Sequence, residues 1–167
     1  GQVEAVAPGG LRGSATPVAS DDLVLVVPRD SRLRRLQDAA GAGVEVLGGG
    51  PDSAAGARTA AVLERLDPAM RQALRANLRT SADDGAAVVA AVAAGRADAG
   101  LAFRSDVRQA PEGVRARVLP RRVRPRTVYR AGVVRGAHDP KTARAFVDAL
   151  RAGPCAVALR DDGFATP

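Results

Sequence analysis

Residues 44–66 read VEVLGGGPDSAAGARTAAVLERL, a short apolar run followed by three glycines, a cap-like Asp-Ser pair and an alanine-rich stretch. This order predicts a strand at 44–47, a glycine loop, and a helix from about residue 54 to 66 that ends before Pro68. A helix that begins just after such a loop directs unpaired N–H groups and the positive end of its dipole at the space above the loop. The pattern therefore predicts an anion site, although the same glycines can serve simply as a strand-to-helix turn.

A second segment repeats this arrangement. Residues 81–84 (Ser-Ala-Asp-Asp) form a capping sequence before an apolar helix predicted at 85–94, which is followed by a buried strand predicted at 97–103. Further strands are predicted at 23–27, 77–80, 115–119 and 127–134, and further helices at 30–39, around 69–74 and from 140 onward. The alternation predicts an α/β fold with a mixed, mostly parallel sheet and helices on both faces. Ligands of such sheets lie where loops leave the carboxyl ends of the strands.

The amino-terminal part of the chain is expected to be less regular. Residues 8–20 are rich in Gly, Pro, Ser and other small residues, which favours an irregular connector, with regular structure beginning at Asp22. Asp30 and Ser31 then provide a cap for the helix predicted at 30–39, which Gly41 would end.

The basic charge of the chain is carried almost entirely by arginine. The 167 residues include 25 basic and 18 acidic ones, and Lys141 is the only lysine. A GC-rich genome explains this composition more simply than a nucleic-acid ligand, because nucleic-acid surfaces usually add stacking aromatic residues and aromatics make up only 2% of this chain. Seven arginines fall within residues 115–130, where we favour a solvated strand edge over a nucleic-acid footprint.

Side chains suited to catalysis or metal binding are scarce. The one cysteine, Cys155, excludes an intrachain disulfide and a cysteine-rich metal site, and His138 lies in a turn before a helix. Asp83 and Asp84 are explained by helix capping. The glycine loop lacks the Gly-Lys-Ser/Thr ending of a nucleotide-binding loop. We therefore expect no metal, no cofactor and no enzyme activity.

Four segments, taken in order, resemble the molybdate-binding substrate-binding proteins of ABC importers, which have the two-lobed periplasmic-binding fold. They are DDLVLVVPRDS at 21–31, LGGGPDSAAGARTAAVLERL at 47–66, AAVVAAVAAGRADAGLAF at 86–103 and ARAFVDALRAGPCAVALRDDGF at 143–164. The resemblance implies a substrate-binding component that takes a tetrahedral oxyanion such as molybdate or tungstate. It also implies an ABC transporter permease as partner, and a periplasmic or extracellular, membrane-associated location.

The same resemblance divides the chain into three parts. Residues 1–22 would connect from a lobe one whose amino-terminal part is missing, residues 23–134 would form lobe two with crossover strands at both ends, and residues 135–167 would be helices that return to lobe one. The chain would thus hold one side of the ligand cleft, and the missing lobe one is an expected partner.

The resemblance also implies which residues bind the ligand. The family holds its oxyanion with helix-start amides and a tyrosine hydroxyl from lobe two; the amides fall on Ala55 beside Gly56 and on Gly85 beside Ala86, and the tyrosine position falls on Phe103. Loss of one donor to a charged ligand costs about 1.5–3 kcal/mol, or roughly ten- to hundredfold in affinity. We therefore expect weak oxyanion binding.

Other functions fit the same sequence. The chain could be a ligand-sensing domain of the same fold with a different small ligand. It could also be a basic domain that binds polyanions or nucleic acid, with steep salt dependence, although we do not expect nucleic acid as its partner. An enzyme acting on phosphate esters ranks last.

Replacing Phe103 with tyrosine should tighten oxyanion binding if this position faces the cleft, because the hydroxyl restores a donor. Titration with molybdate, tungstate, sulfate and phosphate measures the change. An unchanged affinity would place the ring of Phe103 in the hydrophobic core instead.

Overall fold

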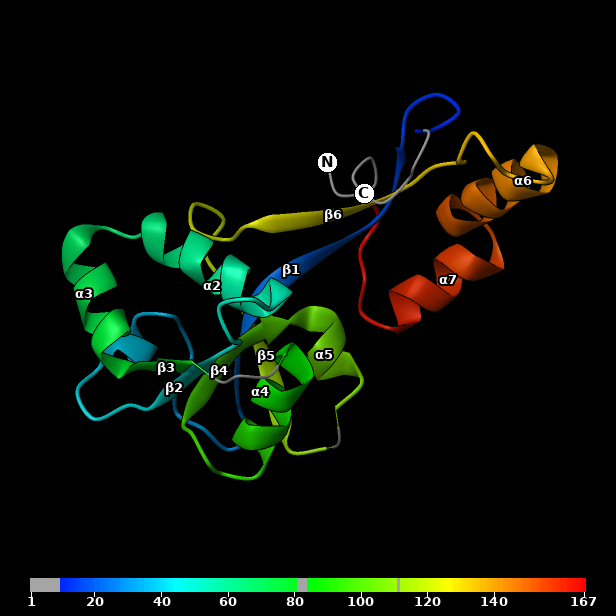
Figure 1. The fold of residues 1–167 in the computed structure, drawn as a ribbon. Coiled ribbons are helices and arrows are strands. Elements are labelled where there is room, and N and C mark those ends of the chain that lie inside the picture. Colours follow the sequence, from blue (N-terminus) through cyan, green and yellow to red (C-terminus); the bar gives the residue numbers. More distant parts are fainter. Residues whose placement is uncertain (1–9, 81–83, 111) are drawn as a thin grey trace. The chain divides into compact units, whose positions relative to one another are not determined.

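The computed structural model describes residues 10–80, 84–110 and 112–167. The chain forms two compact units, one built from its two ends (Gly1–Asp21 and Thr127–Pro167) and one from the middle (Asp22–Arg126). Figure 1 shows the chain coloured along its sequence. No helix among the described residues has the length and apolar character needed to span a membrane.

A mixed six-stranded sheet organises the fold. Its strands are β1 (Thr16–Pro28), β2 (Val46–Gly48), β3 (Leu78–Thr80), β4 (Ala99–Phe103), β5 (Val114–Val118) and β6 (Arg126–Ala131). The strand order is β3-β2-β4-β1-β5, and β6 also pairs with β1. β2 runs parallel to β3 and β4, whereas β1 runs antiparallel to β4 and β5. The predicted mixed sheet with helices is confirmed. It is less parallel than predicted, because β1 runs antiparallel to both β4 and β5.

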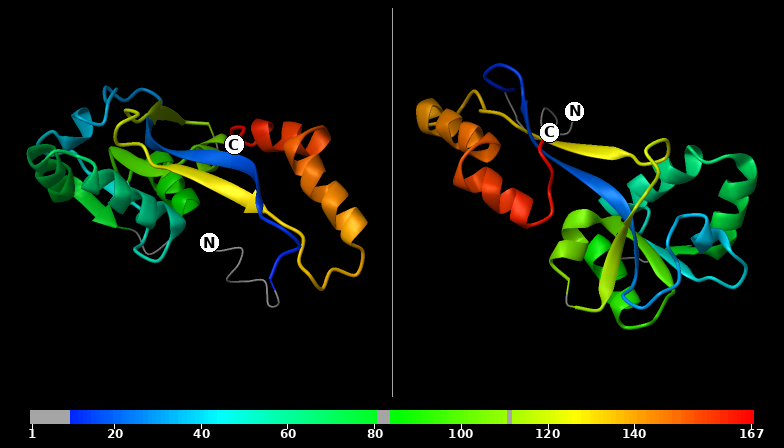
Figure 2. Two further views of the ribbon diagram at one scale, coloured as in Figure 1. Left: turned by 90° about the horizontal axis from the view of Figure 1, so that it is seen from above. Right: turned by 180° about the vertical axis from the view of Figure 1, so that it is seen from behind.

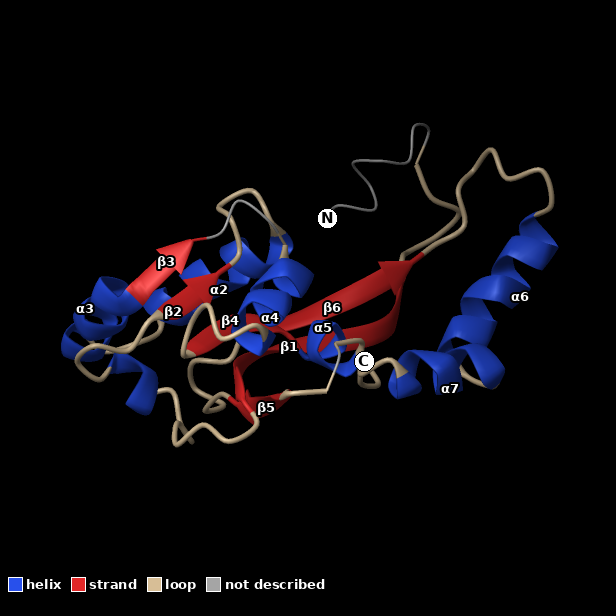
Figure 3. Cartoon of the chain, turned by 90° about the horizontal axis from the view of Figure 1, so that it is seen from below, coloured by secondary structure: helices blue, strands red, loops and turns tan. Residues whose placement is uncertain are grey.

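The middle unit has helices on both faces of this sheet. They are α2 (Ala54–Glu64), α3 (Pro68–Asn77), α4 (Gly85–Ala93) and the short α5 (Arg104–Arg108), with the 3₁₀ turn η1 at Asp38–Ala40. Figure 3 shows how these helices alternate with the strands. α5 was not predicted from the sequence, because five residues are too few to establish a helical period.

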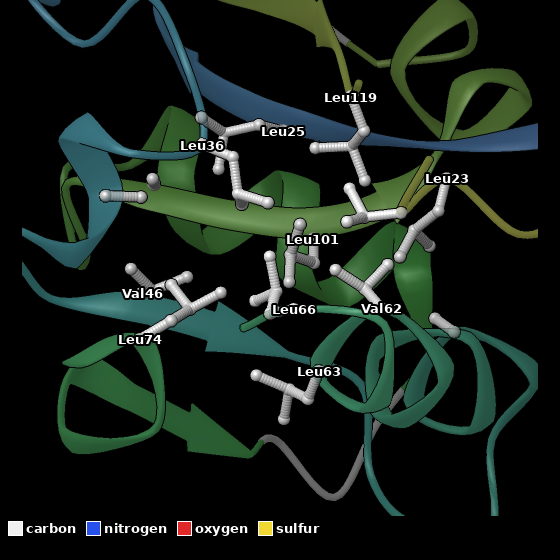
Figure 4. Close-up of a cluster of buried hydrophobic side chains, with 14 of the residues drawn as sticks. Leu23, Leu25, Leu36, Val46, Val62, Leu63, Leu66, Leu74, Leu101 and Leu119 are labelled. Carbon is white, nitrogen blue, oxygen red and sulfur yellow. The ribbon is translucent and has the colours of Figure 1, made fainter. Parts of the chain in front are cut away.

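Alternate residues of β1 pack into two separate hydrophobic clusters. Leu23, Leu25 and Val27 belong to the cluster formed with α2 and α3, part of which is drawn in Figure 4, and Val24 and Val26 belong to the cluster formed with α4. All five side chains are fully buried. Successive side chains of a strand point to opposite faces, so this continuous apolar run is what a strand covered on both faces requires.

The predicted helix starts coincide with side-chain caps. Ser53, Asp84 and Asp139 cap α2, α4 and α6 (Pro140–Arg151) by accepting hydrogen bonds from backbone N–H groups of the first turn. The starts predicted at residues 54, 85 and 140 are thereby confirmed. Residues 81–83 of the predicted capping sequence lie outside the described residues.

The helix predicted at 30–39 is wrong. Only η1 forms there, because local side chains accept the N–H groups that would begin a longer helix: Ser31 Oγ accepts from Leu33 N at 3.2 Å, and Asp38 Oδ2 accepts from Arg34 N at 2.7 Å and Arg35 N at 2.9 Å. Short polar side chains that bond nearby backbone compete with helix formation in this way.

The irregular connector predicted at 8–20 is also wrong in its later part, because β1 begins at Thr16. This strand segment pairs with residues from the other end of the chain: β6 lies beside β1 (Figure 2), and Ser20 N and Ala165 N each donate to the other residue's carbonyl oxygen at 2.8 Å. Long-range pairing therefore imposes a strand on a sequence that locally favours none.

The unit built from the two chain ends carries α6 and α7 (Pro154–Asp161), which pack against each other. Tyr129 on β6 meets Phe164 edge to face, with ring centroids 5.5 Å apart. Two apolar side chains of these helices stay exposed, Phe146 by 60% and Val157 by 46%.

Truncating Leu101 to alanine should destabilise the chain by about 2–5 kcal/mol, because its fully buried side chain leaves a cavity in the cluster beneath α2. Urea unfolding measures the loss. The matched control is Val118→Ala on β5, where the side chain is 59% exposed and the cost should stay within about 0.5 kcal/mol. Equal losses for the two variants would contradict the assignment of Leu101 to the core.

Candidate functional site

Three helices of the middle unit begin at one edge of the sheet. β2, β3 and β4 are parallel, and the register pairs Gly48 with both Thr80 and Leu101. The carboxyl ends of these strands therefore lie side by side. Along the chain, β2 is followed by α2, β3 by α4, and β4 by α5, while α3 comes between α2 and β3. In open α/β sheets this edge is where ligands bind.

The start of α2 satisfies one of its own donors. Ser53 Oγ accepts from Gly56 N at 2.9 Å and donates to the carbonyl of Gly50 at 2.8 Å, so the N–H of Gly56 is already used. Ala55 is only 2% exposed, and its N–H has no acceptor within the described part of the chain. Of the two residues predicted here, Ala55 is therefore the one that retains a donor for a ligand.

Close packing explains the glycine loop. A Cβ on Gly56 would overlap the carbonyl oxygen of Gly50, and a Cβ on Gly49 would lie 2.9 Å from both Ala55 Cβ and Gly56 N. Only glycines let the loop backbone approach the first turn of α2 this closely. The loop is thus required by packing whether or not a ligand binds, and the same packing fixes the position of the Ala55 N–H.

The start of α4 lies close to two carboxylates. Asp84 Oδ1 accepts from Ala87 N at 3.1 Å, while Asp106 Oδ2 accepts from Phe103 N at 3.0 Å. The Asp106 carboxylate also rests against the Cα of buried Gly85, where a Cβ would overlap Oδ2. The N–H groups of Gly85 and Ala86 have no acceptor among the residues that the structure describes.

Ala86 is exposed, and it faces a pocket between α4 and α5. The pocket has a volume of about 230 Å³ and is lined by Ala86, Val89 and Ala90 of α4 together with Asp106, Gln109 and Ala110. Sequence reasoning missed Asp106, although its position three residues after the end of a strand is typical of a side chain that caps a following helix.

The ring of Phe103 packs in the hydrophobic core. It is 7% exposed and belongs to the same cluster as Leu23, Val62 and Leu101. Phe103 does lie at the carboxyl end of β4, on the edge where the helices begin. The structure gives its ring a packing role, and its part in ligand binding stays a prediction.

Positive charge is present near the same edge. Because Leu23 is paired with Phe103, Asp22 lies at this edge, and its carboxylate forms an ion pair with Arg124 at 3.1 Å. Of the seven arginines in residues 115–130, Arg117 and Arg124 are half-buried and the others are exposed. Their exposure fits the solvated strand edge that the sequence predicts.

The described residues hold no group of three or more His, Cys, Asp or Glu side chains that could bind a metal ion. His138 is exposed and Cys155 is half-buried.

A family model described as bacterial extracellular solute-binding protein matches residues 2–165. The chain belongs to this family. A search of curated proteins finds no match. The family is one of solute-binding proteins rather than enzymes, which agrees with the scarcity of catalytic side chains.

Solved structures with the same fold include a protein assigned as the substrate-binding domain of a molybdenum ABC transporter from Clostridium difficile, with a TM-score of 0.80, 20% identity, and coverage of 92% of this chain and 66% of that one. PEB3 of Campylobacter jejuni, bound to L-phospholactate, has a TM-score of 0.76, 15% identity and coverage of 92% and 68%. The periplasmic molybdate-binding protein of Azotobacter vinelandii has a TM-score of 0.68 and 18% identity, with coverage of 94% of this chain and 70% of that one. These likenesses show the periplasmic-binding-protein fold, and the chain spans about two thirds of the length of each of these proteins.

Replacing Gly56 with alanine should cost about 1–3 kcal/mol of stability, because the new methyl group overlaps the Gly50 carbonyl and forces the loop away from α2. Gly136→Ala is the matched control, since a Cβ there meets nothing within 4 Å and the residue has an ordinary backbone conformation. Thermal unfolding of both variants tests the close approach. A Gly56→Ala variant as stable as Gly136→Ala would contradict it.

Proposed function

We propose that this chain binds a small tetrahedral oxyanion, such as molybdate or tungstate, through backbone N–H groups at the starts of α2 and α4. The observation that carries the proposal is the N–H of buried Ala55, which the glycine loop holds near the carboxyl end of β2 without an acceptor in the described chain. A helix start of this kind favours negative charge through both its free donors and its dipole.

The similar structures support the same class of ligand. Two of the three name molybdenum or molybdate, and the third holds a phosphate-bearing ligand. Because the chain spans about two thirds of these proteins, further parts of the function are also proposals: delivery of the ligand to an ABC transporter permease, a periplasmic or extracellular location, and an amino-terminal lobe that completes the cleft.

A polyanion-binding role is the second candidate, supported by the net charge of +7 and by the exposed arginines between residues 115 and 130. The two functions differ in their response to salt and to ligand size. A polyanion binder releases many counterions and loses affinity steeply with salt. A small-oxyanion site distinguishes sulfate, phosphate and molybdate from one another.

Removing the Ala55 N–H should weaken oxyanion binding about ten- to hundredfold, because one charge-assisted hydrogen bond is lost. Ala55→Pro removes this donor without breaking an intrahelical bond, since N–H groups of the first turn have no helical partner. The measurement is the shift of backbone amide NMR signals during titration with molybdate, sulfate and phosphate.

Ala54→Pro is the matched control, because it removes the neighbouring first-turn N–H at the first helical position. Both variants must unfold at similar temperatures for the comparison to hold. Equal affinity for the two variants would contradict the role of Ala55. Binding of an oligonucleotide without any response to small oxyanions would favour the second candidate.

A further inference from the structure

Asp106 occupies the space that a side chain at position 85 would fill. A Cβ added to Gly85 would overlap Asp106 Oδ2 and lie 2.9 Å from Asp106 Cγ. The same Oδ2 accepts from Phe103 N at 3.0 Å, which ties the carboxylate to the end of β4. The absence of a side chain at Gly85 therefore allows a negatively charged group to lie against the first turn of α4.

This position is where the proposed ligand would meet α4. The N–H groups of Gly85 and Ala86 are the donors that the proposed site requires, and Asp106 lies directly beside Gly85. Asp106 also lines the pocket that Ala86 faces, so the carboxylate borders a solvent-accessible space beside the first turn of α4. An oxyanion bound at this start would therefore sit within a few Å of a carboxylate.

A carboxylate at this distance opposes the binding of anions in proportion to their charge. At a separation of about 5 Å in a largely solvated environment, the repulsion corresponds to about a fivefold loss of affinity for a monoanion and about twenty-fivefold for a dianion. Asp84 adds a second carboxylate to the same turn, although its side chain is used as the helix cap and is exposed.

We propose that Asp106 is a specificity-determining residue of the oxyanion site, which lowers the affinity of the α4 start for dianions relative to monoanions of the same shape. This inference rests on the proposed function. It adds a preference that the helix starts alone do not have, because helix dipoles and free N–H groups favour the dianion.

The test compares two tetrahedral ligands that differ in charge, molybdate as the dianion and perrhenate as the monoanion. Asp106→Asn removes the charge and keeps an oxygen that can accept from Phe103 N. We expect molybdate affinity to rise about twenty-fivefold and perrhenate affinity about fivefold. The 167-residue chain is titrated with each ligand, and the amide NMR signals of Ala55 and Gly85 report binding.

Asp98→Asn is the matched control for net charge. Asp98 precedes β4 at the opposite edge of the sheet and accepts from Glu45 N at 2.8 Å, a bond that asparagine can also accept. This variant should leave the ratio of the two affinities unchanged. An equal change of the ratio in both variants would overturn the inference, because the effect would then come from overall charge.

Gly85→Ala provides a second, independent variant that keeps the charge and displaces the carboxylate from the helix start. The ratio of molybdate to perrhenate affinity should rise here as well. If Asp106→Asn does not fold, this variant alone tests the role of Asp106. Wild-type ratios in the folded variants, with the Ala55 signal still responding to oxyanions, would overturn the role of Asp106 alone. No response of any variant to either ligand would overturn the proposed function and this inference with it.

Discussion

The structure depends on one strand that is buried on both of its faces. β1 places Leu23, Leu25 and Val27 under α2 and α3, while Val24 and Val26 pack under α4. Burial of such apolar side chains is the main favourable term in folding, so both layers of helices are anchored to the same five residues. β4 lies beside β1, and the parallel strands β3, β2 and β4 end at one edge of the sheet, where α2, α4 and α5 begin.

Much of this arrangement is visible in the sequence because it is governed by local signals. Apolar runs predict β1 and β4, and capping residues such as Ser53 and Asp84 predict where α2 and α4 begin. The errors arise where a distant or competing interaction decides the outcome. Residues 16–20 become a strand through pairing with β6 and Ala165, and residues 30–37 fail to form a helix because Asp38 captures the N–H groups of Arg34 and Arg35.

The candidate site also combines features that local sequence signals predict with features that only the folded chain reveals. Sequence reasoning finds both helix starts, but it cannot find which of their N–H groups the chain uses itself. Gly56 donates to Ser53, whereas Ala55 has no acceptor in the described residues. Asp106 reaches Gly85 only because the fold packs α5 beside α4, and Phe103 lies in the core because the outer end of β4 is covered by α2. These relations depend on tertiary packing and leave no periodic signal in the chain.

The contact between Gly50 and Gly56 has a consequence for how such a protein can change its ligand in evolution. The N–H groups of the proposed site belong to the main chain, so no substitution other than proline removes them, and the glycine that fixes one of them tolerates no side chain. Mutation therefore acts mainly on the space around the donors. At Gly85, alanine would add volume against the Asp106 carboxylate, whereas aspartate or arginine would change both volume and charge beside the same main-chain donors.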